Sequence, residues 1–249
     1  MVGGGAWAEE PLGVQDPAVS SALLGSTDHA AICLIEPSME VDVGTPADGV
    51  LKVVNADRGD LVQRDQLLAK LDTAVQEAAA NVLAAKAAYG ARRFERNEDL
   101  QKRQLISNQE LDEIATEQKL AELELKERRE QIRLRSIFSP IRGIVAERYR
   151  NRGDLVKQEK IFRIVQLDPL HVETVLPANF FGRVAMGQEF EVLPQLVGHP
   201  FVARVSAIDR VIDAASSTFR VRLLVANPVF EITPGQRCSI NFKPVGTDP

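Results

Sequence analysis

The sequence predicts a mainly β fold in which an α-helical coiled-coil hairpin interrupts a small β-sandwich and a small β-barrel follows. Three observations support this prediction. A strand-rich segment occurs twice, a long charged segment with helical spacing separates the two copies, and several alternating apolar segments follow the second copy. Because a repeated segment marks one structural unit that is used twice, the repeat determines how the rest of the chain is interpreted.

The repeat comprises residues 46–72 and residues 140–166, which align without a gap. The identical positions are Pro46 and Pro140, Gly49 and Gly143, and the runs 58–62 and 152–156. Each copy reads strand, turn, strand, with Gly59 or Gly153 at a turn where a positive φ favours glycine. Since a single two-stranded unit is marginally stable in water, we expect the two copies to bury their apolar faces against each other as a pseudo-symmetric sandwich.

Each copy resembles half of a biotinyl/lipoyl domain, with a glycine at the first strand, the sequence Gly-Asp-x-Val and a later apolar pair. In carrier domains of that family, a tight hairpin with a modified lysine joins the halves. Here the first half ends at Leu71-Asp72-Thr73, and Ala74-Val75-Gln76 follows without a lysine. A lipoyl-like sandwich that is split at this position by a helical hairpin resembles the periplasmic adaptor family, the membrane fusion proteins of haemolysin-D (HlyD) type that include RND efflux adaptor subunits.

The patterns and this resemblance together predict how the chain is divided. The segments are a disordered N-terminal segment (1–29), an N-terminal strand with the first half of the lipoyl-like domain (30–72), the helical hairpin (73–136), the second half of the lipoyl-like domain (137–167), the β-barrel domain (168–243) and a tail (244–249). In the segment 30–43, two short β-leaning runs are separated by Pro37. Ala6-Trp7-Ala8 resembles the end of a secretory signal, but no apolar stretch precedes it, so a cleaved signal and a chance match both stay open.

The segment between the copies has the 3–4 apolar spacing of a coiled coil. Thr73 can cap the first helix. The expected seam of the first arm is Val75, Ala78 or Ala79, Val82, Ala85 and Tyr89, and that of the second arm is Leu111, Ile114, Gln118, Ala121, Leu125, Arg128 and Ile132. Arms of roughly thirty residues would be about 45 Å long.

The turn between the arms carries the candidate functional residues. Ser107 or Asn108 can cap the second arm, and Arg96, Leu100 and Ser107 stand in the order Arg-x3-Leu-x6-Ser. This order resembles the tip motif with which adaptors engage the helical barrel of an outer-membrane channel. Leu100 is an isolated apolar residue among charges, so we expect it to be exposed and to bind such a partner.

The region after the second copy alternates apolar and polar residues in several short segments. The expected strands are 171–176, 190–193, 201–208, 218–225 and 238–242, with a helical turn within 177–186. Asn227-Pro228 and Pro234-Gly235 mark turns. Strands of this length with turns between them predict a small closed barrel, which the adaptor family also has.

The two cysteines, Cys33 and Cys238, are too few for a disulfide framework. We expect two separate buried thiols that pack as small apolar groups. A single disulfide is the alternative in an oxidising compartment. A lipoprotein signal at Cys33 is disfavoured because Ala30-Ala31-Ile32 puts a bulky residue before it.

Composition and motifs exclude several function classes. The net charge is −5 and no basic stripe with interleaved aromatic residues occurs, which argues against nucleic-acid binding. No run of eighteen apolar residues could span a bilayer as a helix. His29, His171 and His199 lack cysteines or carboxylates at metal-ligand spacing, and no phosphate-loop, dinucleotide or Gly-x-Ser-x-Gly motif occurs. We therefore expect a protein that is not an enzyme, without catalytic, metal-binding or cofactor-binding residues.

The resemblance implies a periplasmic adaptor subunit of a tripartite efflux pump. Such a subunit bridges an inner-membrane transporter, with the RND type favoured, and an outer-membrane channel, and it is expected to form a hexameric ring with copies of itself. It would lie in the periplasm and associate with the inner membrane through its transporter. Two alternatives stay open: the adaptor of an ABC-type secretion system, and a biotin or lipoate carrier subunit of an enzyme, which needs a modifiable lysine outside a strand, whereas Lys70 lies inside one.

Overall fold

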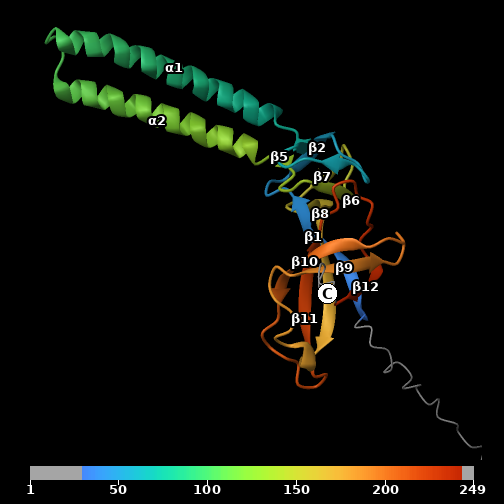
Figure 1. Cartoon of the computed structure of the whole chain (residues 1–249). Coiled ribbons are helices and arrows are strands. Elements are labelled where there is room, and N and C mark those ends of the chain that lie inside the picture. The colour runs from blue at the N-terminus through green and yellow to red at the C-terminus, as the bar shows by residue number, and fades with distance from the viewer. Residues whose placement is uncertain (1–29, 243–249) are drawn as a thin grey trace, which may run out of the picture.

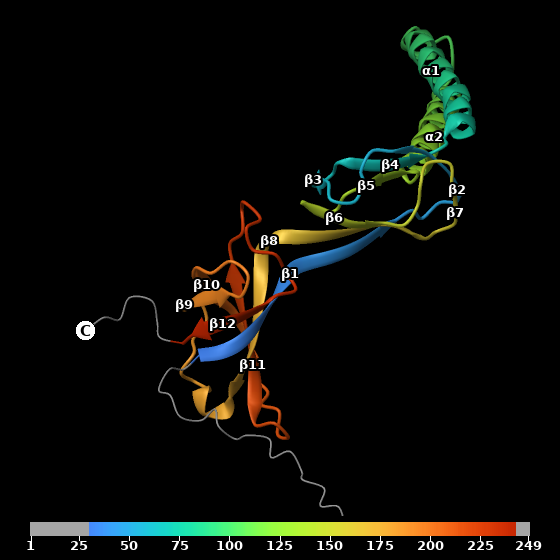
Figure 2. The same ribbon diagram turned by 90° about the vertical axis from the view of Figure 1, so that its right-hand side faces the viewer.

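The structure is a computed structural model that describes residues 30–242. It arranges them as three parts in a row: a β-barrel, a β-sandwich and a helical hairpin (Figure 1, Figure 2). The predicted disordered segment 1–29, with its signal-like Ala6-Trp7-Ala8, and the predicted tail 244–249 lie outside the described residues. Within 30–242 the fold is mainly β, as the repeat and the alternating segments predicted, and two long helices occupy the segment that has helical spacing.

Two long strands connect the barrel and the sandwich. β1 (Ala30–Gly44) and β8 (Lys160–Pro177) pair antiparallel, and both run through the two β parts (Figure 2). The N-terminal strand expected in this segment is present as β1, which joins the two β-leaning runs and continues through Pro37. A register shift between Pro37 and Met39 accommodates the proline, which has no N–H to offer a regular ladder.

The barrel is closed by six strands in the order β1, β12, β9, β10, β11, β8, with β8 pairing again with β1. Beyond the two long strands these are β9 (Glu189–Pro194), β10 (Phe201–Ile208), β11 (Thr218–Val225) and β12 (Arg237–Asn241). Each strand contributes to one apolar core, for example with Ile35, Val172, Val192, Val205, Leu223 and Ile240. The predicted helical turn is present as the 3₁₀ helix η1 (Ala178–Phe180).

Cys33 and Cys238 form a disulfide, which corrects the expectation of two separate thiols. They lie directly opposite each other on the neighbouring antiparallel strands β1 and β12. Both are almost completely buried. The strand pairing brings together residues that are 205 positions apart in sequence, and no local pattern could have predicted this register.

Each of the two sheets of the sandwich contains strands from both copies of the repeat. One sheet has the order β5 (Ser136–Phe138), β4 (Leu67–Leu71), β2 (Gly49–Val54), β7 (Leu155–Val156), and the other continues from β8 through β6 (Gly143–Arg148) to β3 (Leu61–Val62). The short strand of each copy therefore pairs with the long strand of the other, β3 with β6 and β7 with β2. Equivalent residues fill the shared core, such as Leu51 and Val145, Val62 and Val156, and Leu68 and Phe162.

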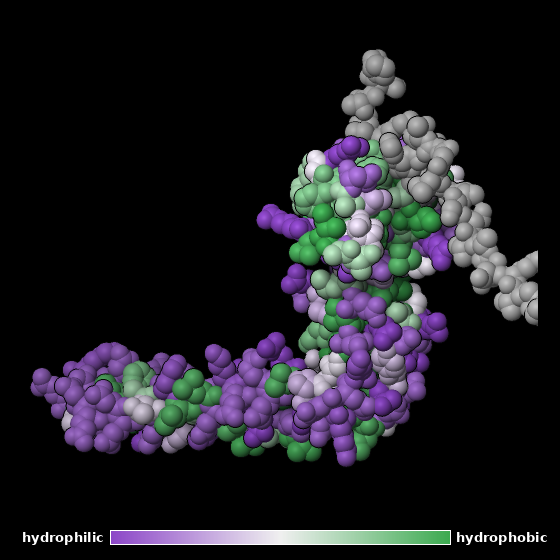
Figure 3. Space-filling model, turned by 90° about the horizontal axis from the view of Figure 1, so that it is seen from below, coloured by the Kyte–Doolittle hydropathy of each residue, from purple (hydrophilic) through white to green (hydrophobic). Residues whose placement is uncertain are grey.

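The helices α1 (Ala74–Lys102) and α2 (Asn108–Arg133) leave the sandwich between β4 and β5 and lie side by side (Figure 1). In the view of Figure 3 they form an arm at a steep angle to the β parts. The surface of this arm is mostly hydrophilic and is interrupted by separate apolar groups.

Candidate functional site

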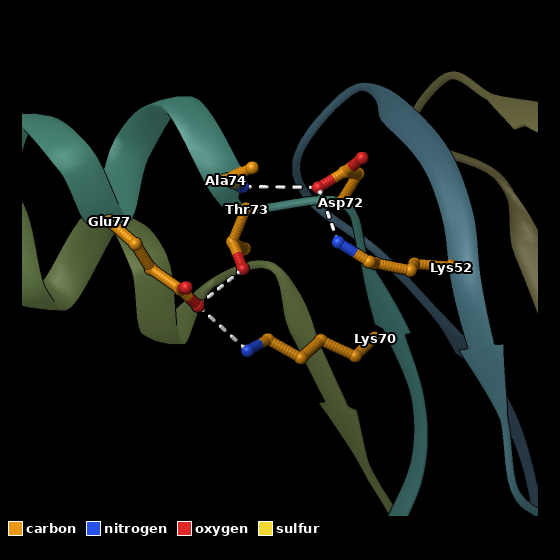
Figure 4. Close-up of polar contacts among 6 residues, drawn as sticks. All are labelled: Lys52, Lys70, Asp72, Thr73, Ala74 and Glu77. Atoms are coloured by element: carbon orange, nitrogen blue, oxygen red, sulfur yellow. Dashed lines mark hydrogen bonds and ion pairs between the residues drawn. The ribbon is translucent and has the colours of Figure 1, made fainter.

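The hairpin is joined to the sandwich by a polar cluster at the start of α1, shown in Figure 4. The Asp72 carboxylate accepts a hydrogen bond from the backbone N–H of Ala74 at 3.1 Å and from the Lys52 ammonium at 3.2 Å. These two donors, the Ala74 N–H foremost, lower the pKa of Asp72 below its usual value of 3.8. Asp72 thus binds an otherwise unpaired N–H of the first turn, as a helix N-cap does.

Thr73 occupies the N-cap position that the sequence predicted, but its side chain accepts no N–H from the helix. Its hydroxyl instead donates to the Glu77 carboxylate at 2.6 Å, and the Lys70 ammonium binds the same carboxylate oxygen at 2.9 Å (Figure 4). The Thr73 hydrogen bond and Lys70 lower the pKa of Glu77 below its usual value of 4.5. Lys70 lies on β4, and its ion pair with Glu77 links this strand to the first turn of α1.

The two helices contact each other along a narrow seam of small residues. The most buried side chains are Ala80 and Ala87 on α1 and Ile114 and Ala121 on α2. A Cβ added to Gly90 would lie 3.4 Å from the Cα of Gln118, so the backbones approach closely. The ion pairs Lys86–Glu124 and Arg93–Glu117 connect the helices beside this seam.

The predicted seam is right for α2 and wrong for α1. On α2, every predicted seam position is buried or partly buried. On α1, the predicted seam residues Val75, Val82, Ala85 and Tyr89 are exposed. The covered positions on the side that faces α2 include Ala80, Leu83, Ala87, Gly90, Phe94 and Asn97. Alanine occurs on nearly every side of α1, so the 3–4 spacing alone fits two different faces of this helix.

The tip places Arg96 and Leu100 on the last turns of α1 and Ser107 directly before α2. The hydroxyl of Ser107 accepts the N–H of Glu110 at 3.1 Å, which confirms it as the N-cap of the second helix. Arg96 and Ser107 are exposed, and Leu100 keeps 37% of its surface accessible. Leu100 and the N-cap residue Ser107 thus lie at the same end of the hairpin. The side chains of Arg96, Leu100 and Ser107 are all accessible there.

The tip contains one apolar residue that sequence analysis missed. Leu105 is 67% exposed in the turn between the helices, and its N–H donates to the carbonyl of Leu100 at 2.9 Å. Gln101 and Asn108 bind each other across the turn at 2.8 Å, and Gln104 has a positive φ of 61°. An apolar residue within a turn was the signal in the sequence, since such positions are usually polar.

Within residues 30–242, neither a cluster of metal ligands nor a membrane-spanning helix is present. No group of three or more histidines, cysteines, aspartates or glutamates there could hold a metal ion. Neither helix of this part of the chain combines the length and the apolar character that crossing a membrane requires.

Two protein-family models match the chain. A barrel-sandwich hybrid domain of RND membrane fusion proteins matches residues 39–184, and a CusB-like β-barrel domain matches residues 170–246. A curated protein of Haemophilus influenzae, described as uncharacterized, is 24% identical over 193 residues, which are 76% of this chain and 50% of the relative. The chain therefore spans about half the length of the curated relative that it matches.

The fold is similar to that of several solved structures. A MacA–MexA chimera with the α-hairpin domain of Pseudomonas aeruginosa MexA has a TM-score of 0.72 and 21% identity, covering 87% of this chain and 79% of the chimera. The membrane fusion protein Spr0693 of Streptococcus pneumoniae has a TM-score of 0.68 and 17% identity, covering 86% and 98%. MacA of Actinobacillus actinomycetemcomitans has a TM-score of 0.64 and 20% identity, covering 87% and 78%. At these identities the likeness concerns the fold alone.

Proposed function

The chain belongs to the RND membrane fusion protein family, and we propose from this premise that it is a periplasmic adaptor subunit of a tripartite efflux pump. Members of this family are periplasmic, membrane-associated adaptors of efflux pumps. For this chain the proposal rests chiefly on one observation: a lipoyl-like sandwich opens into a two-helix arm whose far end keeps apolar side chains accessible to a partner.

The tip of the arm is the proposed contact with an outer-membrane channel. Leu100 would be buried in the complex, Arg96 would supply a charge-assisted hydrogen bond, and Ser107 would bind at the turn. The neighbouring Leu105 extends the apolar surface at the tip. We further propose that the two helices act as a coiled coil that holds this surface at a fixed distance from the β parts.

The opposite end of the molecule is the proposed side of the inner-membrane transporter. The family model that matches residues 39–184 is described for RND systems, which favours an RND transporter over an ABC-type one. Copies of the chain would pack side by side in a ring, for which a hexamer is expected. The Cys33–Cys238 disulfide supports a periplasmic location, because disulfides persist in oxidising compartments.

A role as biotin or lipoate carrier is disfavoured by the surroundings of Lys70. In biotin and lipoate carrier domains, the modified lysine lies in the turn between the two halves of the sandwich. In this chain α1 begins at that position. The Lys70 ammonium lies on a strand and binds Glu77. The intact mass of the chain after production with a biotin or lipoate ligase would reveal an adduct, and an adduct on any lysine would establish the carrier role.

Affinity purification from cross-linked cells of the source organism tests the adaptor function. The tagged chain should retrieve both an inner-membrane transporter and an outer-membrane channel. The variant Leu100→Asp should still retrieve the transporter and should lose the channel. Retrieval of neither membrane protein by the unaltered chain would contradict the adaptor function.

A further inference from the structure

The outer wall of the barrel carries an apolar patch beside the disulfide. Cys33 points into the core, so its neighbours on β1, Ile32 and Leu34, lie on the outer surface, where they are 75% and 39% exposed. Leu193 on β9 and Val175 on β8 are 43% and 53% exposed on the same wall. Exposed apolar side chains that adjoin one another on a folded domain mark a binding surface.

A short side chain produces the first groove in this patch. Ser239 on β12 lies opposite Leu193 on one side and opposite Ile32 on the other. Because the serine side chain is much shorter than its two neighbours, it leaves a hollow of about 330 Å³ between them. The buried residues Pro194 and Cys238 complete the lining on this side.

A second groove of about 460 Å³ adjoins the first. Ile32, Leu34 and Val175 contribute its apolar side chains, and both grooves are lined by Ile32 and Arg237. Hollows of about 300–1,000 Å³ with mostly apolar walls and a few polar groups are typical of small-molecule sites in proteins. Each groove has this size and this kind of lining.

Arg237 is the charged residue that the two grooves share. It is exposed on β12 and lies directly opposite Leu34. Within residues 30–242 its guanidinium makes neither an ion pair nor a hydrogen bond. A guanidinium presents a planar set of N–H donors that suits a carboxylate. The grooves therefore offer an anion a free donor group beside apolar side chains.

The other charged residues of the grooves leave the charge of Arg237 uncompensated. Glu173 lines the second groove, but its carboxylate binds Arg222 and its side chain is only 21% exposed. Arg220 lines the same groove and lies 3.8 Å from the Asp209 carboxylate. Both grooves thus attract an anion rather than a cation.

The disulfide holds the two grooves in place. Cys238 lines the first groove and Cys33 lines the second. The bond between them fixes β1 against β12, the two strands that contribute Ile32 and Arg237. A site whose walls are fixed before binding loses less conformational freedom when a ligand enters.

We propose that the two grooves bind a free anionic amphiphile, which is a molecule with an alkyl chain and a single carboxylate head, as in a fatty acid. The chain lies against the apolar side chains of the grooves, and the carboxylate accepts charge-assisted hydrogen bonds from Arg237. The inference goes beyond the proposed function and does not depend on it, because the grooves lie on the barrel and the tip lies at the far end of the hairpin (Figure 1).

The surroundings of the grooves favour a ligand of this kind. On β9 the outward residue before Leu193 is Glu191, and on β8 the outward residue before Val175 is Glu173. These charged residues interrupt the apolar surface along both strands. The apolar contact is therefore concentrated in the hollows around one free cation, which matches an alkyl chain with one anionic head.

Binding of decanoate to the full-length chain tests the inference. Isothermal titration calorimetry below the concentration at which decanoate forms micelles gives the Kd. We expect the unaltered chain to bind decanoate and neutral decanol, and to bind decyltrimethylammonium much more weakly. Arg237→Gln should weaken decanoate binding about tenfold or more and leave decanol binding unchanged. Arg237→Lys, which retains the charge, should preserve part of the affinity for decanoate.

Ser239→Leu tests the groove itself. The added side chain fills the hollow between Leu193 and Ile32, so the affinities for decanoate and decanol should both fall. Arg204→Gln is the matched control, since Arg204 is exposed on β10, binds Glu189 and lines neither groove. It should leave decanoate binding unchanged. All of these positions lie on the outer wall, and the melting temperatures of the variants should stay close to that of the unaltered chain.

Four results would overturn the inference. They are no decanoate binding by the unaltered chain, equal affinity of Arg237→Gln, equal affinity for decyltrimethylammonium, and equal weakening by Arg204→Gln. Sedimentation with phosphatidylglycerol vesicles distinguishes a membrane surface from a free ligand. If the chain bound these vesicles through Arg237 but did not bind decanoate, the patch would be a lipid-surface contact and the proposal would fail.

Discussion

Gly59 and Gly153 hold the same turn in the two copies of the repeat, and each donates its N–H to a carbonyl of the other copy. Gly59 binds Val145 at 2.9 Å and Gly153 binds Leu51 at 2.8 Å. Their φ values are +92° and +96°. Val145 and Leu51 are themselves equivalent positions of the repeat, so the sandwich has an internal twofold pseudosymmetry that extends to single hydrogen bonds.

This symmetry predicts that Gly59→Val and Gly153→Val destabilise the protein by similar amounts. A Cβ at either position would meet no atom within 4 Å, so the cost comes from the positive φ. We expect a loss of about 1–3 kcal/mol for each, measured by urea unfolding. Asparagine, which tolerates a positive φ better, should cost less at both positions. Tolerance of valine at one position alone would show that the two turns are not equivalent.

A second pair of glycines should behave unequally. A Cβ on Gly143 would lie 2.4 Å from the carbonyl oxygen of Val165, whereas a Cβ on Gly49 would lie 3.2 Å from the Arg135 guanidinium and 3.3 Å from Leu71 Cδ1. Side chains can move aside more easily than a paired strand. Gly143→Ala should therefore cost about 1–3 kcal/mol of unfolding free energy and Gly49→Ala distinctly less. Equal losses in urea unfolding would contradict the close strand approach at Gly143.

The Cys33–Cys238 disulfide is expected to stabilise the barrel. Removing it with Cys33→Ala and Cys238→Ala together should cost about 2–5 kcal/mol, since the crosslink restricts the unfolded chain. Thermal unfolding with and without a reductant measures this. The reductant should lower the melting temperature of the unaltered protein and leave the double variant unchanged. If the reductant has no effect on either protein, the two sulfurs are not bonded in solution.

The cluster at the start of α1 should make the hairpin root sensitive to acid. Because the pKa values of Asp72 and Glu77 are lowered in the folded protein, their stabilising contribution is complete above the usual values of 3.8 and 4.5 and is lost as pH falls through the lower folded values. Amide hydrogen exchange in the first turn of α1 should therefore show weaker protection below about pH 4 than at pH 7, after correction for intrinsic rates.

The matched control for the hairpin root is Glu77→Gln at pH 7. It should weaken protection of the same amides without lowering the pH, because it removes the charge that binds Lys70. Amides of the barrel strand β10 serve as the reference. An acid effect of equal size in β10 would indicate general unfolding and would contradict a local origin.

Leu100→Asp should abolish export while leaving thermal stability nearly unchanged. Leu100 is already partly covered, so completing its burial at a channel would contribute about 1 kcal/mol, whereas a carboxylate buried in its place would cost several kcal/mol. Channel binding should therefore weaken more than tenfold. Melting curves and an export assay on the same variant provide the measurement.

Ile114→Asp is the matched control for the tip prediction. Ile114 is buried in the seam between the helices, so a charge there should destabilise the hairpin as well as abolish export. If Leu100→Asp lowered the melting temperature as much as Ile114→Asp, Leu100 would be a packing residue and the tip-docking proposal would fail.

Much of this fold could be predicted from local patterns in the sequence. The repeated Gly-Asp-x-Val turns predicted that two distant segments form one sandwich, since neither copy could bury its apolar face alone. The α2 seam was predicted because Leu111, Ile114, Ala121, Leu125 and Ile132 follow the 3–4 spacing along one face of the helix. The cap at Ser107 and the accessible Leu100 were predictable because helix ends and isolated apolar residues are local features.

Only the tertiary structure decided which face of α1 meets α2 and which partners the cysteines have. Alanines lie on several faces of α1. The position at which the chain leaves β4 and the side chains of α2 together determine which of these faces packs against α2. The pairing of Cys33 with Cys238 depends on the register between β1 and β12, which the closure of the whole barrel sets. The packed face of α1 and the pairing of the cysteines both depend on contacts between segments that are far apart in sequence. The patterns that can be recognised in a sequence arise from residues that are close together along the chain.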